Sequence, residues 1–113
     1  MGNYKELIIL IAEDDDGHAE LIIDALKASG IRNHFIRFSN GEEAWHFLSR
    51  TGDSEVRDSN KHYLLLLDIK MPKMDGTEVL KRIKGDDDLK NIPIMMLTTT
   101  DDPREVEECY RLG

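Results

Sequence analysis

The stretch that decides the fold is LLLLDIKMPKMDG, residues 64–76. A short apolar run bounded by turn-forming residues is typical of a strand buried on both faces, and such strands belong to parallel sheets covered by helices. Asp68 then lies where this strand leaves the core. Because carboxylates are rarely buried without a partner, we expect Asp68 either to pair with a cation or to take part in chemistry at the edge of the sheet.

Strand and helix patterns alternate along the rest of the chain. Apolar residues at helical spacing separate the strand-like runs, and a fourth helix is expected after Pro103. This alternation predicts an α/β fold, a flavodoxin-like doubly wound parallel sheet with strand order 2-1-3-4. The strand patterns are LIILIA (7–12), HFIRF (34–38), YLLLLD (63–68) and IPIMML (92–97), and the helical stripes are Ala19, Ile22, Ile23 and Leu26, then Ala44, Phe47 and Leu48, then Val79, Leu80 and Ile83 from a start near Thr77. Residues 49–62, SRTGDSEVRDSNKH, are polar and predict a surface loop.

Length, charge and cysteine content limit the kind of protein. The 113 residues suffice for one domain, and a single cysteine excludes an internal disulfide. The run LIILIA is too short to cross a bilayer, and no secretory signal pattern is visible, so we expect a cytoplasmic protein. A formal net charge of −8 argues against nucleic acid or an anionic membrane as a partner, because both are bound through Lys and Arg clusters.

Acidic residues follow the first strand as well as the third. In EDDDG, residues 13–17, Glu13 and Asp14 come directly after the apolar run. In the predicted strand order the first and third strands are neighbours, so these carboxylates should meet Asp68 at the point where strand order reverses. Carboxylates that crowd together raise their own pKa values unless a cation neutralises them, and Mg²⁺ is the natural candidate. For Asp15 and Asp16 we prefer capping of the following helix.

Two further features bear on the chemistry. The fourth strand ends in TTT, where the hydroxyl of Thr98 could donate to a phosphoryl oxygen. The four histidines show neither an i, i+4 pair nor a neighbouring cysteine, which disfavours zinc and favours surface or loop roles, His18 included.

These residues resemble the receiver domain of two-component response regulators over the whole chain. Glu13 and Asp14 are similar to the acidic pair of that family, DIKMPKMDG to its phosphoacceptor signature, and Thr98 falls at its switch hydroxyl. The resemblance implies that Asp68 accepts a phosphoryl group from a phosphohistidine on a sensor histidine kinase. It also implies a signalling domain that catalyses only its own phosphorylation and dephosphorylation, and is therefore no enzyme in the usual sense.

The same resemblance implies a magnesium site. Asp14 and Asp68 would bind Mg²⁺ through their side chains and Lys70 through its backbone carbonyl, while Glu13 would act mainly through a bound water. The 49–62 loop and the opening EDDDGHAEL resemble small single-domain regulators served by phytochrome-type histidine kinases.

One departure from the family concerns the end of the chain. Receivers have a fifth strand with a lysine that pairs with the phosphoryl group, then a last helix, whereas this sequence stops at YRLG. We therefore expect residues 1–113 to be a C-terminally truncated receiver domain in which the fifth strand and the last helix are absent and no residue takes the lysine's role. The fourth strand would then form an apolar edge, which favours either a longer native chain or a homodimer.

Three alternative functions can be compared with individual residues of the sequence. A magnesium-dependent phosphatase with an aspartate nucleophile would need a second aspartate where Lys70 stands. An EF-hand fails on spacing, because Ala12 and Ile23 would occupy ligand positions. A receiver-like interaction module that is never phosphorylated is disfavoured by Asp14, Asp68 and Thr98, but the missing fifth strand keeps this alternative open.

Overall fold

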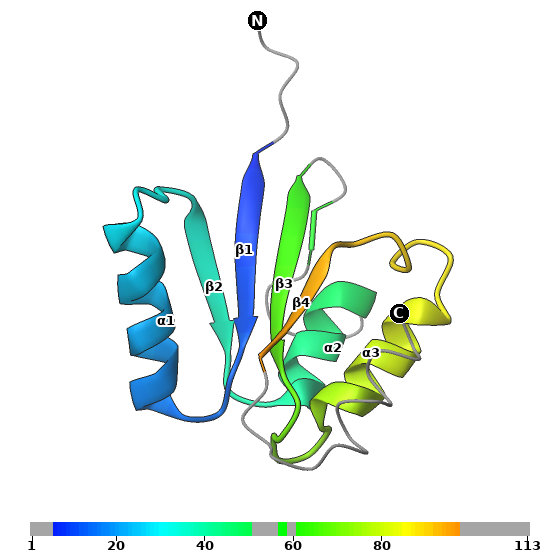
Figure 1. The fold of residues 1–113 in the computed structure, drawn as a ribbon. Helices are drawn as coiled ribbons and strands as arrows, with labels where there is room; N and C mark the ends of the chain where they lie inside the picture. The colour runs from blue at the N-terminus through cyan, green and yellow to red at the C-terminus, as the bar shows by residue number, and fades with distance from the viewer. Residues whose placement is uncertain (1–5, 51–56, 59–60, 98–113) are drawn as a thin grey trace, which may run out of the picture.

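A parallel sheet with helices on both faces makes up the described part of the chain (Figure 1). The computed structural model describes residues 6–50, 57–58 and 61–97. Its elements, in chain order, are β1 (Leu7–Ala12), α1 (Asp16–Ala28), β2 (His34–Phe38), α2 (Gly41–Ser49), β3 (His62–Asp68), α3 (Gly76–Lys84) and β4 (Ile94–Leu97).

The strand order is β2-β1-β3-β4 and every pairing is parallel, so the predicted fold class and the order 2-1-3-4 are confirmed. The predicted bounds of the first two strands are also correct, and β3 begins one residue early, at His62. The fourth strand begins at Ile94 instead of residue 92. Pro93 has no N–H for the ladder, although its carbonyl still accepts a hydrogen bond from Leu65 N at 3.0 Å.

Both faces of the two central strands are buried, which explains their uninterrupted apolar runs. Side chains alternate between faces along a strand, so Leu65 and Leu67 of β3 face one way and Leu66 the other. The first set packs with α2 and α3 in the larger core, and the second packs with α1. Figure 1 shows α1 on one side of the sheet and α2 and α3 on the other.

The predicted helical stripes face the sheet, and the larger core buries them more completely. The stripes on α2 and α3 are fully buried: Ala44, Phe47, Leu48, Val79, Leu80 and Ile83. On α1 only Ala19 is buried, and the other stripe residues Ile22, Ile23 and Leu26 are half-buried. The third helix begins at Gly76, next to the expected start near Thr77. The carboxylate of Asp75 caps it by accepting a hydrogen bond from Glu78 N at 3.0 Å.

The predicted loop 49–62 is one residue too long at each end, because Ser49 closes α2 and His62 opens β3. Two described residues between them are tied to the core: Arg57 N donates to Phe47 O at 3.0 Å, and Asp58 N donates to Tyr63 Oη at 2.7 Å. The predicted fourth helix lies outside the described residues. Among the described strands β4 is an edge with Met95 59% exposed, and the expected homodimer stays a prediction.

Candidate functional site

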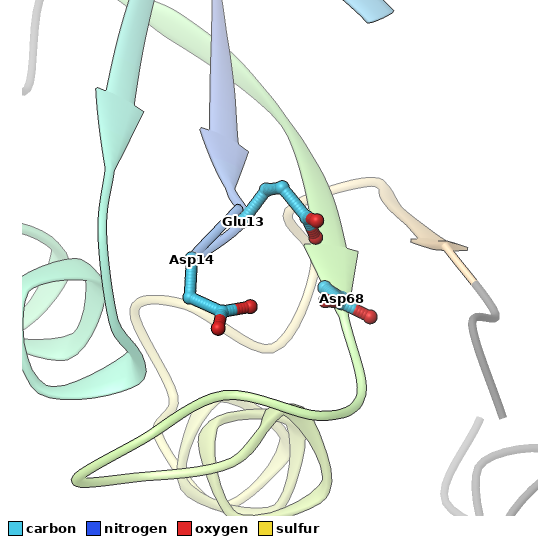
Figure 2. Close-up of side chains that lie close together, drawn as sticks. All are labelled: Glu13, Asp14 and Asp68. Atoms are coloured by element: carbon cyan, nitrogen blue, oxygen red, sulfur yellow. The ribbon is translucent and has the colours of Figure 1, made fainter. Parts of the chain in front are cut away.

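Three carboxylates meet at the carboxyl ends of β1 and β3. Glu13 and Asp14 directly follow β1, and Asp68 is the last residue of β3. The two strands are parallel neighbours with Ala12 opposite Leu67, so their ends bring these residues to the same point of the sheet. One oxygen from each carboxylate lies within 4.8 Å of the other two (Figure 2). The predicted meeting of Glu13, Asp14 and Asp68 is therefore found.

The three side chains differ in their access to solvent. Glu13 is 2% exposed and Asp68 is 1% exposed, whereas Asp14 is exposed. The cluster thus has a buried floor made by two carboxylates and an outer rim made by the third. A ligand that arrives from solvent would meet Asp14 first.

The crowding of the three carboxylates is visible in the pKa of Glu13. Burial, followed by the neighbouring Asp68 carboxylate, raises the pKa of Glu13 from 4.5 to about 7, and the contact with His18 opposes this shift. Among the described residues, none hydrogen-bonds the buried Oε2 of Glu13. A crowded carboxylate with a spare buried oxygen fits a hard divalent cation, which prefers oxygen ligands.

One residue of the site was missed by sequence reasoning. The Nδ1 atom of His18 lies 3.1 Å from Oε1 of Glu13, within hydrogen-bonding distance. The ring is 55% exposed, so the predicted surface position is correct, but its contact with the acidic cluster was not foreseen. The signal was available, since His18 lies within the first turn of a helix that begins directly after the acidic residues.

The remaining acids after β1 do what their positions predict. Asp15 is the N-cap of α1 and accepts a hydrogen bond from His18 N at 2.9 Å. This backbone contact lowers the pKa of Asp15. Asp16 lies in the first turn of α1 and pairs with Arg37 at 2.5 Å. Asp15 thus caps α1 as expected, whereas Asp16 lies in the first turn, where an acidic residue favours the helix dipole.

The turn that follows Asp68 folds back on the strand end. Gly76 N donates to Ile69 O at 2.8 Å, which closes the segment between β3 and α3. Lys73 in this turn adopts a left-handed backbone with φ of 66°. Lys70 lies in the same segment, two residues beyond Asp68, and Thr98 lies outside the described residues.

A family model agrees with this geometry. The response regulator receiver domain model matches residues 9–113. Among curated proteins, the chain is 39% identical over 105 residues to response regulator Rcp1 of Synechocystis sp., an alignment that covers 93% of this chain and 70% of Rcp1.

Solved structures give the same result. The bacteriophytochrome response regulator AtBRR superposes with a TM-score of 0.84 at 35% identity, covering 97% of this chain and 79% of that one. The Mn²⁺-bound form of Rcp1 gives 0.81 at 37% identity, with 94% and 75% covered. The phosphorylated cyanobacterial phytochrome response regulator RcpA gives 0.79 at 33% identity, with 97% and 76% covered.

The matched family accounts for both the fold and the acidic cluster. It has the parallel sheet found here, and one relative has been solved with a divalent cation and another in phosphorylated form. The chain belongs to the receiver domain family of two-component response regulators, signalling domains that are phosphorylated on an aspartate.

Proposed function

We propose that Asp68 is the phosphoacceptor of this chain and takes its phosphoryl group from a phosphohistidine of a sensor histidine kinase. The observation that carries this assignment is the position of Asp68, a carboxylate 1% exposed at the end of a central strand and beside two further carboxylates. A nucleophile on a packed strand is held in one direction, which in-line attack on phosphorus requires.

The phosphoryl transfer needs no reactant besides Asp68 and the phosphohistidine. A carboxylate oxygen of Asp68 forms a bond to phosphorus while the bond from phosphorus to the histidine nitrogen breaks, and the imidazole leaves with the electron pair. Hydrolysis of the resulting acyl phosphate returns the Asp68 carboxylate and releases inorganic phosphate. The chain would thus catalyse its own phosphorylation and dephosphorylation.

The acidic cluster fits a magnesium ion. Asp14 and Asp68 would hold it through their side chains, Lys70 through its backbone carbonyl, and Glu13 mainly through a water molecule. When bound, Mg²⁺ offsets the negative charge of the phosphoryl oxygens. The buried Oε2 of Glu13, which has no hydrogen-bond partner within the part of the chain that the structure describes, supports this assignment, and so does the Mn²⁺-bound form of Rcp1.

Three other assignments complete the proposal. Thr98 follows β4 in the sequence, and its hydroxyl would donate to a phosphoryl oxygen. The kinase would be of the phytochrome type, because AtBRR and RcpA are described as phytochrome response regulators. The compartment would be the cytoplasm. Among the described residues, no helix has the length and apolar character needed to cross a membrane.

Labelling with a small phosphodonor tests the phosphoacceptor. With radiolabelled acetyl phosphate and Mg²⁺, we expect an acid-stable, base-labile label on Asp68 that Asp68→Asn abolishes. Asp75→Asn is the matched control, because Asn also caps helices well and α3 should be kept. Label that persists in Asp68→Asn would show that another residue is the acceptor. Repeated turnover of a small phosphate ester would favour a phosphatase instead.

A further inference from the structure

A single guanidinium on β2 ties together two points of the turn between β1 and α1. Nε and Nη2 of Arg37 both donate to the backbone oxygen of Glu13, at 3.1 and 2.8 Å. Nη1 donates to Oδ1 of Asp16 at 2.5 Å. The Arg37 side chain is 25% exposed although that of Asp16 is 91% exposed. The guanidinium therefore lies against the turn and does not extend into solvent.

The two anchored points flank Asp14. The N–H of Glu13 also donates to Phe38 O at 3.1 Å. The peptide groups on both sides of Glu13 are therefore hydrogen-bonded to residues of β2, Phe38 on one side and Arg37 on the other. Asp14 is exposed, and the direction of its carboxylate depends on the backbone that carries it. Whatever holds Glu13 and Asp16 in place also holds Asp14 between them.

The shape of the arginine side chain matters for this role. A guanidinium presents its N–H groups in a rigid planar fork, so it can reach a carbonyl and a carboxylate at the same time in a fixed geometry. A lysine at the same position keeps the charge but is a single flexible point donor. The simultaneous hydrogen bonds to Glu13 and Asp16 therefore require an arginine and not simply a cation.

We propose that Arg37 is a positioning residue for the cation site, one that fixes the backbone of Glu13 and Asp14 before the ion arrives. This role rests on the proposed function, because the cation belongs to that proposal. Partners that orient metal ligands from outside the ligand set are typically worth about 10- to 100-fold in metal affinity. Arg37 would act through the backbone oxygen of Glu13 and the carboxylate of Asp16, which hold the turn that carries Asp14.

Charge and positioning predict opposite results when Arg37 is changed. The guanidinium is a cation near a site for a cation, so if its charge alone mattered, its removal would strengthen metal binding. If it positions the ligands, its removal weakens binding because Glu13 and Asp14 lose their fixed geometry. The sign of the change in affinity therefore separates the two effects.

Titration with Mn²⁺, followed by the electron paramagnetic resonance signal of the free ion, measures this affinity directly. We expect Arg37→Gln and Arg37→Lys each to weaken Mn²⁺ binding about 10-fold or more. Arg82→Gln is the matched control, because Arg82 also pairs with a carboxylate, Glu78 at 2.9 Å, but does so on α3. We expect Arg82→Gln to leave the affinity unchanged.

Two comparisons make the result decisive. Thermal unfolding in EDTA shows how much of each variant is folded, and a merely structural arginine would lower the melting temperature without changing the affinity of the folded protein. If Arg37→Gln does not fold, the Mn²⁺ affinity of Arg37→Lys alone decides the inference, because this variant keeps the charge but loses the planar fork. Unchanged or tighter Mn²⁺ binding in the folded Arg37 variants would overturn the inference.

The proposed function fails in a different way. Asp14→Asn and Asp68→Asn remove ligands, so they must weaken Mn²⁺ binding if the site is real. If they do so while the Arg37 variants bind normally, only the positioning role is wrong. If neither ligand variant changes the affinity for Mn²⁺, the assignment of the cation site is wrong, and the positioning role of Arg37 is wrong as well.

Discussion

Gly76 lies so close to the main chain of Asp68 that it has no room for a side chain. A Cβ atom at Gly76 would lie 2.0 Å from the backbone oxygen of Asp68 and 2.9 Å from Cα of Ile69. Both of these atoms belong to the backbone, so a rotamer change cannot relieve the contact. The start of α3 therefore packs directly on the strand end that presents the proposed phosphoacceptor.

Gly76→Ala should destabilise the protein even though alanine is the better helix former. The contact with Asp68 has to be relieved by moving backbone, and overpacking of this kind costs about 1–3 kcal/mol or more in the free energy of unfolding. Urea denaturation in EDTA measures this loss. Gly85→Ala is the control, because its Cβ would lie 3.4 Å from the nearest atom, an ordinary contact. Equal stability of the two variants would contradict the close approach.

The strand order and the acidic cluster could be predicted because few physical rules decide them. An apolar run such as that of β3 has to be buried on both faces, which requires a parallel sheet with helices on either side. Once β1 and β3 are neighbours, Glu13, Asp14 and Asp68 must meet at their carboxyl ends. The helix cap at Asp15 follows from local sequence in the same way.

The contacts around the cluster could not be predicted, because they depend on rotamers and on packing between distant residues. Arg37 reaches Glu13 across 24 positions of sequence, and the contact of His18 with Glu13 depends on the rotamers of both side chains. A signal for Arg37 did exist, since a charged residue within the run HFIRF needs a polar partner if the strand is packed. The sequence showed that a partner was needed without showing which one.

Removal of charge at the rim of the cluster should weaken metal binding. Asp14→Asn keeps the size of the side chain but removes its negative charge, so the affinity for Mg²⁺ should fall strongly. Isothermal titration with Mg²⁺ measures the change. Asp87→Asn controls for net charge, because Asp87 is 96% exposed and pairs with Lys90. The assignment of Asp14 is wrong if both variants bind as the parent does.

Tyr63→Phe should loosen the segment before β3 without disturbing the core. The Tyr63 ring is 7% exposed and packs edge-on against Phe47 with ring centroids 5.6 Å apart, a contact that phenylalanine keeps. The lost group is the hydroxyl that accepts from Asp58 N, and such hydrogen bonds contribute about 0.5–1.5 kcal/mol. Amide exchange at Asp58 should accelerate, while that at Leu65 within β3 should change little. Protection of Asp58 that survives the substitution would contradict the contact.

The metal-free protein should lose stability as the pH rises, and Glu13 should be a cause. Its pKa is raised from 4.5 to about 7 in the folded state, mainly by burial and by Asp68. Between these values the folded protein binds more protons than the unfolded chain, so stability falls with rising pH and the loss levels off above the folded pKa.

Glu13→Gln cannot ionise and should remove this part of the pH dependence. In EDTA, the free energy of unfolding of the variant relative to the parent should therefore increase as the pH is raised from about 5 to about 8. Urea denaturation of both proteins at each pH gives this difference. Glu43→Gln is the control, because Glu43 lies exposed in the first turn of α2 and is not one of the three clustered carboxylates. If Glu13→Gln and the parent change in parallel with pH, Glu13 is not the buried group that titrates in this range.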